Sequence, residues 1–162
     1  HNHADASLIQ KVNAMLQSDS QAIPDTLPEW QEWLEDSGGS CHAQMIQSPL
    51  SGLANLLLKG FASDAVFLVQ LALPKDGNRW MLVTGVECEQ NSSVMPKLRS
   101  LLILDPQVRA VWACGHNARV TLPVRGQNNA VGLQHKLCIY RTLDGGYLAC
   151  TVLCVVMIQA RA

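Results

Sequence analysis

At 162 residues, with 48% hydrophobic and 15% charged residues, the chain has the composition of an ordinary globular protein. It can bury roughly 70% of its unfolded surface in one core. A formal net charge of −1 excludes the basic surplus on which nucleic-acid binding depends, and no run approaches the roughly 18 apolar residues of a membrane-spanning helix.

Three helices are expected before residue 61. Residues 5–17 place apolar side chains on one stripe at helical spacing, which predicts an amphipathic helix. Thr26, with Glu29 three residues later, has the pattern of a capping box and predicts the start of a second helix. Ser48-Pro49 opens a third helix, and Gly60 is expected to end it.

From Ala65 onward the sequence changes to short apolar runs, which predict strands, with hairpins at Asp76-Gly77 and Asp144-Gly145-Gly146. The first three strands should form an antiparallel meander. Helices followed by strands predict an α+β fold in a single domain, residues 1–162, with a helical part (5–60) packed on a mostly antiparallel sheet (65–160). The expected strands are Ala65–Leu73, Trp80–Val86, Ser100–Pro106, Val111–Cys114, Ala118–Val124, Lys136–Thr142 and Tyr147–Ile158.

The six cysteines follow no paired Cys-x-x-Cys spacing, and most lie in apolar runs, where a reduced cysteine behaves as a small hydrophobe. Cys41, Cys114 and His116 could meet as zinc ligands, but no local spacing supports such a site. We therefore expect no metal, no cofactor and a reducing, cytoplasmic compartment, although the even number leaves disulfides open. The chain opens without a basic-then-apolar leader, and residues 1–4 could be the remainder of a purification tag.

Over residues 50–124, a helix is followed by three strands, of which the second opens on Trp80 with Gly85 inside it, and the third ends in Asp105-Pro106. This order resembles the second half of papain-like cysteine peptidases, and is most similar to bacteriocin-processing (double-glycine leader) peptidases. The resemblance implies a papain-like fold. It also implies a histidine just before the aromatic residue of the middle strand and an aspartate that orients it.

Arg79 holds the position of that histidine, and its guanidinium stays protonated at any working pH, so it cannot serve as a base. If the strands of Trp80 and Asp105 are antiparallel neighbours, Arg79 comes close to Asp105 and the two would form an ion pair. Arg79 and Trp80 are the predicted binding residues. The alternative is that Arg79 is a solvated turn residue and that Asp105 only ends a strand before proline.

The resemblance also implies a cysteine nucleophile at the start of a helix, where the helix N-terminus lowers the pKa of the thiol. Cys41 is the candidate, because it lies in a glycine-rich loop ahead of a predicted helix. His116 is the candidate for a displaced base and Asp105 for its orienting carboxylate. Alternatively, Gly38-Gly39 only ends a helix, Cys41 is a loop thiol and His116 is a surface residue.

Three functions remain open. The first is a non-catalytic papain-like domain that binds a protein or peptide, because an arginine stands where the base should be. The second is an active cysteine peptidase or amidase that uses Cys41 with a relocated histidine. The third is a structural protein that forms a homo-oligomer through the Tyr147–Ile158 strand or through Trp30 and Trp33.

Overall fold

A computed structural model of the chain describes residues 6–18, 23–37, 41–47, 52–89, 97–108, 115–123 and 137–160. The helices in this part are α1 (Ala6–Gln17), α2 (Leu27–Asp36) and α3 (Leu53–Ala62). The strands are β1 (Cys41–Gln47), β2 (Val66–Leu73), β3 (Gly77–Glu89), β4 (Lys97–Leu104), β5 (Ala118–Thr121), β6 (Cys138–Thr142) and β7 (Tyr147–Ala160).

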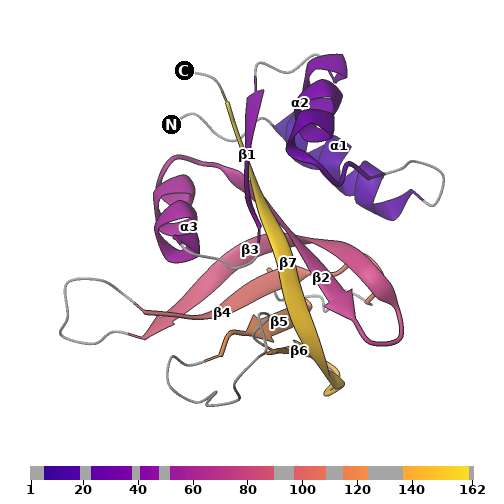
Figure 1. Cartoon of the computed structure of the whole chain (residues 1–162), viewed down its shortest axis with the longest axis vertical. Helices are drawn as coiled ribbons and strands as arrows, with labels where there is room; N and C mark the ends of the chain where they lie inside the picture. The colour runs from indigo at the N-terminus through magenta and orange to yellow at the C-terminus, as the bar shows by residue number, and fades with distance from the viewer. Residues whose placement is uncertain are drawn as a thin grey trace.

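The strands form one antiparallel sheet in the order β1-β7-β2-β3-β4-β5-β6, and β6 pairs back onto β7. This last pairing closes β2 to β7 into a six-stranded barrel, while β1 lies outside the barrel on the far end of β7. Figure 1 shows the barrel below, with α1 and α2 packed beside β1 and the upper part of β7. The expected α+β fold, with helices packed on an antiparallel sheet, is therefore wrong, because the protein is mostly β and six of its strands close into a barrel.

The length of β7 explains the closure. This strand has 14 residues and pairs with β6 through Tyr147–Cys150, with β2 up to Ile158, and with β1 as far as Ala160. The β6–β7 pairing is a hairpin and has a turn motif in the sequence. The pairings of β7 with β2 and with β1 join segments far apart in the chain, and no local motif predicts them. The prediction that residues 5–60 form a helical part is wrong in one segment, because residues 41–47 form a strand that pairs with the end of β7.

The predictions that rest on short turn and capping motifs agree better with the structure. The meander of β2, β3 and β4 is confirmed, and its first turn uses Gly77 at φ 70°. The β6–β7 hairpin is confirmed with Gly145 at φ 99°, where a side chain would be strained. α2 begins with the predicted capping box of Thr26 and Glu29. The strand expected over Val111–Cys114, the Gly38-Gly39 end and the Ser48-Pro49 start lie outside the described residues.

The end predicted for the third helix at Gly60 is wrong, because α3 continues to Ala62. Gly60 is buried against β2, and a Cβ atom there would lie 2.2 Å from Cζ of Phe67. The glycine therefore serves close helix–strand packing rather than termination. None of the helices in the described part of the chain has the length and hydrophobicity that crossing a membrane requires.

Two hydrophobic clusters lie on opposite sides of the sheet. One fills the barrel with inward side chains such as Phe67, Met81 and Ile103, and α3 adds Leu53 and Leu57 to it. The other packs α1 and α2 against the outer faces of β1, β2, β3 and β7. Both clusters contain buried cysteines, as expected for small hydrophobic residues: Cys138 and Cys150 in the barrel, and Cys41 and Cys154 under the helices.

Candidate functional site: a buried carboxylate and a cationic cavity

Asp105 follows the last residue of β4 and its side chain is fully buried, at 0% exposure. One oxygen, Oδ2, accepts hydrogen bonds from Arg79 Nη1 at 2.8 Å and from the Tyr140 hydroxyl at 2.6 Å. The other, Oδ1, accepts one from the backbone N–H of Gln107 at 2.8 Å. The antiparallel register of β3 and β4 brings the start of one strand to the end of the other, so the predicted Arg79–Asp105 ion pair is confirmed.

Arg79 is not a solvated turn residue. Its side chain is 14% exposed, and its second terminal nitrogen lies 3.0 Å from Oδ2 of Asp76. The guanidinium thus joins a buried carboxylate and an exposed one at the end of the barrel. Because both terminal nitrogens of Arg79 and both oxygens of Asp105 are engaged, this group is organised to hold structure together.

Asn117 clamps the backbone around the same carboxylate. Its Oδ1 accepts a hydrogen bond from the N–H of Asp105 at 2.7 Å, and its Nδ2 donates to the carbonyls of Asp105 and Val108, both at 2.9 Å. Sequence reasoning missed Asn117, which stands in a turn where asparagine is common. It also missed Tyr140, because the residue approaches Asp105 only once the barrel is closed.

The Tyr140 hydroxyl stays a neutral donor. Burial raises the pKa of this phenol well above its ordinary value, and the hydrogen bond to Asp105 and the charge of that carboxylate raise it further. The hydroxyl therefore keeps its proton and donates the shortest hydrogen bond of this cluster to Asp105. The arrangement is that of a structural bridge from β6 to β4.

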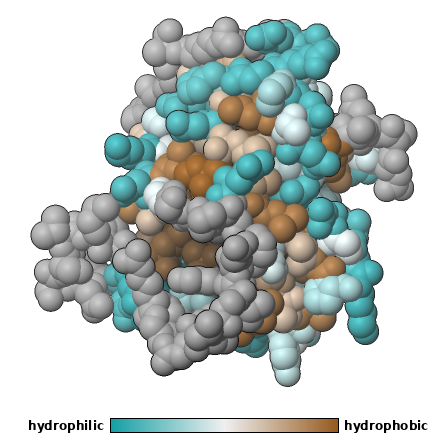
Figure 2. Space-filling view, viewed as in Figure 1, coloured by the Kyte–Doolittle hydropathy of each residue, from teal (hydrophilic) through white to brown (hydrophobic). Residues whose placement is uncertain are grey.

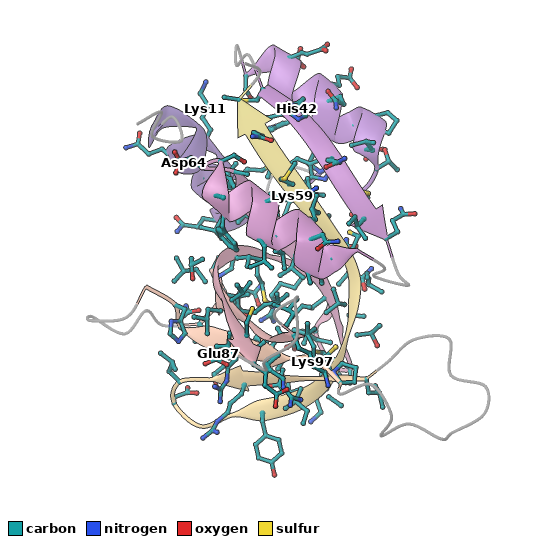
Figure 3. The ribbon with its side chains drawn as sticks, turned by 90° about the vertical axis from the view of Figure 1, so that its left-hand side faces the viewer. Lys11, His42, Lys59, Asp64, Glu87 and Lys97 are labelled. Carbon is teal, nitrogen blue, oxygen red and sulfur yellow. The ribbon has the colours of Figure 1, made fainter. Side chains whose placement is uncertain are left out.

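Cys41 and His116 are not brought together. Cys41 begins β1 and pairs with Ala160 at the end of β7, whereas His116 lies beside Thr142 and Leu143, near the start of β7. A 14-residue strand is about 45 Å long, so the two side chains lie at opposite ends of the molecule. Figure 3 shows this separation through His42, next to the helices, and Glu87, at the barrel.

Other features of Cys41 also differ from the expectation. It starts a strand rather than preceding a helix, and it is 7% exposed. Its neighbour His42 points to the opposite face of the strand, because successive side chains alternate. Asp105 contacts Arg79 and Tyr140, as described, so no histidine is oriented by it among the described residues.

Trp80, the second predicted binding residue, is 4% exposed and faces the helical layer. Its ring packs edge-on against Trp30 with centroids 5.4 Å apart, and its Nε1 lies 3.4 Å from Oδ1 of Asp25. Gln70 Nε2 donates to the same oxygen at 2.9 Å. Trp80 therefore anchors the segment that leads into α2.

A cavity of about 290 Å³ opens beside the β6–β7 hairpin, at the same end of the barrel as Asp105. The backbone N–H of Leu143 in its lining donates a hydrogen bond to the carbonyl of Asn117, whose side chain binds Asp105. Arg119 and Arg141 stand directly opposite each other on β5 and β6. Both oxygens of Glu87 lie 3.1 Å from Nη1 of Arg119, whereas Arg141 has no charged partner among the described residues. The cavity is lined by His116, Arg119, Arg141, Thr142 and Leu143.

The outward side of the β6–β7 hairpin is exposed and partly apolar. Its strand residues alternate with the buried Cys138, Tyr140 and Cys150, and they form two register pairs, Ile139 with Ala149 and Arg141 with Tyr147. We call these four residues the hairpin face. Ile139 is 52% exposed and Tyr147 is 75% exposed. Leu137 and Leu143, just outside the two strands, extend the exposed apolar surface.

Comparison of the chain with protein-family models, with curated proteins and with solved structures finds no match. The resemblance to papain-like peptidases thus stays a prediction from the sequence. In the described part of the chain, no group of three or more His, Cys, Asp or Glu side chains is arranged to hold a metal ion.

Proposed function

We propose that this chain is a non-catalytic binding module that holds an acidic protein or peptide segment against the hairpin face. The observation that carries the proposal is the concentration of exposed large apolar side chains there. Of the six in the described residues, Ile139 and Tyr147 belong to the hairpin face, and Leu137 and Leu143 flank it. The other two lie elsewhere: Leu27 on α2, and Leu148 on the opposite side of the hairpin, where it pairs with the buried Tyr140. Contiguous exposed apolar surface of this kind is typical of interaction sites.

Charge complementarity favours an acidic partner. Arg141 lies within the hairpin face opposite Tyr147, and Arg119 stands next to it on β5. An aromatic ring beside an exposed arginine is a frequent combination at protein interfaces, because both provide large contact areas and directional polar groups. A partner with carboxylates next to apolar residues would match both parts of this surface.

The absence of a chemical role for Asp105 supports the non-catalytic part of the proposal. Its oxygens accept hydrogen bonds from Arg79, Tyr140 and the backbone of Gln107, which leaves it poorly suited to orient a base. The candidate nucleophile Cys41 lies about one full strand length from His116. A peptidase would need these groups within hydrogen-bonding reach.

Selection from a random peptide display library on the immobilised chain tests the proposal. We expect the selected peptides to carry acidic and apolar residues and to bind the Ile139→Ser/Tyr147→Ser variant at least about tenfold more weakly, or ~1.4 kcal/mol. Leu27→Ser is the matched control, because Leu27 is 37% exposed but lies on α2. Equal affinity of the peptides for all three proteins would contradict the proposal.

Self-association is a second candidate, because the same exposed apolar surface could be covered by another copy of the chain. Figure 2 shows one face of the molecule, on which hydrophobic residues form several patches among hydrophilic ones. Light scattering over a range of concentrations separates the two functions. A dimer that Ile139→Ser/Tyr147→Ser dissociates and Leu27→Ser preserves would favour self-association over a peptide partner.

A further inference from the structure

We infer that the cavity beside the hairpin binds one oxyanion, a carboxylate or a phosphate, through Arg119 and Arg141. This inference rests on the proposed function and names the chemical group of the partner that the cavity would hold. The cavity has the volume for such a group, at about 290 Å³, and the residues that line it include two arginines and a histidine.

Two like charges stand opposite each other on β5 and β6. Arg119 and Arg141 are direct cross-strand partners, and like charges in this position destabilise a sheet. Glu87 neutralises Arg119, but Arg141 keeps its charge without a partner among the described residues. An anion between the two guanidinium groups would remove the repulsion, so the pair is better matched to a liganded state than to an empty one.

The carboxylates of Glu87 and Asp144 both have partners other than Arg141. Glu87 is bound to Arg119 and is 42% exposed, so it could give way or share that arginine. Asp144 accepts hydrogen bonds from the hydroxyl of Thr142 and from the backbone of Gly146, which hold it within the hairpin turn. Neither carboxylate contacts Arg141, so within the described ranges this guanidinium has no carboxylate that an incoming oxyanion would have to displace.

Arginine presents a planar fork of N–H donors that binds a carboxylate or phosphate through two hydrogen bonds. Arg141 also forms part of the hairpin face, opposite Tyr147, so the cavity adjoins the proposed peptide-binding surface. An acidic side chain or a phosphorylated residue of a peptide lying on this face could therefore reach the cavity.

Titration with inorganic phosphate and, separately, with acetate at constant ionic strength tests the inference. The arginine Nε–Hε resonances of the ¹⁵N-labelled chain report on each guanidinium. We expect saturable shifts at Arg119 and Arg141. In Arg141→Gln the dissociation constant should rise at least about tenfold. Arg99→Gln is the control, because Arg99 pairs with Glu89 away from the cavity and should leave binding unchanged.

The two anions distinguish the sources. Saturation by phosphate alone supports a phosphorylated partner, and saturation by acetate as well supports a side-chain carboxylate. The inference is overturned if neither anion shifts Arg119 and Arg141, or if the shifts persist in Arg141→Gln. If the anion test fails but the selected peptides still bind Ile139→Ser/Tyr147→Ser more weakly than the wild type, the proposed function stands without the anion site. If the peptides bind that variant as well as the wild type, both the anion site and the proposed function are rejected.

Discussion

Arg79 Nη1 lies 2.8 Å from Oδ2 of Asp105, and this contact ties the first residues of β3 to the residue after β4. The carboxylate is fully buried, while the arginine reaches the surface at Asp76. The pair forms because an antiparallel meander places strand starts and ends side by side. It is retained at the barrel end as a structural link.

Replacing Arg79 with methionine should destabilise the protein by about 3 kcal/mol, because it leaves a buried carboxylate without its counter-charge. Urea unfolding measures this loss. Arg99→Met is the matched control: its ion pair with Glu89 is about one-third exposed and should cost less than about 1 kcal/mol. The Arg79→Met/Asp105→Leu variant should be more stable than Arg79→Met alone, and the opposite order would show that the ion pair is not the source of the effect.

Tyr140→Phe should cost about 2 kcal/mol, because it removes a hydroxyl that donates to a buried charge. The pKa of this phenol is raised in the folded state by burial and by Asp105, so its stabilisation is complete below the unfolded value of about 10 and is lost as the pH rises above it. Unfolding free energies of the wild type should therefore fall more steeply with alkaline pH than those of Tyr140→Phe. Tyr147→Phe is the control: the Tyr147 side chain is 75% exposed, so this variant should have the unfolding free energy of the wild type at neutral pH.

Gly60→Ala should destabilise α3, although alanine is normally the better helix residue by about 1 kcal/mol. The added Cβ would lie 2.2 Å from Cζ of Phe67 and 2.9 Å from Sδ of Met157, and overpacking of this kind costs about 1–3 kcal/mol. Thermal unfolding should show the loss, and Phe67→Leu in the same chain should recover part of it. Lys59→Ala, an exposed position of the same helix, should have little effect.

Sequence reasoning succeeded where the determinants are local. The hairpin at Asp76-Gly77 sets the register of β2 and β3, and the next strand follows it, so the approach of Arg79 to Asp105 could be predicted. Closure of the barrel could not be predicted, because it requires the pairing of β7 with β2, whose residues lie far apart in the chain. Tyr140 illustrates the limit: its position on β6 is evident from the sequence, but its contact with Asp105 requires the closed barrel.

In the candidate site, too, the features that depend on long-range strand pairing could not be predicted from the sequence. Cys41 looked like a loop thiol before a helix, but β7 recruits it as the first residue of a strand. Arg119 and Arg141 face one another only because β5 and β6 pair in a particular register, and nothing in either short segment reveals that register. The sequence offered the Tyr147–Ile158 strand as a possible subunit interface, but it could not show that Ile139 joins Tyr147 on one exposed side, because this depends on the pairing of β6 with β7.

The cap of α2 should respond to acid. Glu29 accepts hydrogen bonds from the backbone N–H groups of Asp25 and Thr26, and these lower its pKa. A lowered pKa gives stabilisation that is present above about pH 4.3 and is lost as the pH falls through the folded value. Glu29→Gln should flatten this part of the pH–stability curve, with Glu32→Gln as a control for charge on the same helix. Thr26→Ala should cost about 1 kcal/mol at neutral pH.

Alkylation tests whether any described thiol behaves as a nucleophile. Burial raises the pKa of Cys150 to about 12 and that of Cys154 to about 11, and it also raises that of Cys138. These three should react with iodoacetamide only after unfolding, whereas Cys88 is exposed on β3. Peptide mapping after brief labelling near neutral pH should find Cys88 modified well before Cys41, which is 7% exposed.

The order of labelling decides between two roles for Cys41. A catalytic cysteine reacts as a thiolate, so it would be modified faster than an ordinary exposed thiol, and it would lose that advantage when its base is removed. A thiol that packs under α2 should react slowly and at the same rate in His116→Ala. If Cys41 is instead alkylated faster than Cys88, and His116→Ala slows its alkylation, the two residues must pair in another conformation. The chain would then be an enzyme and not a non-catalytic binding module.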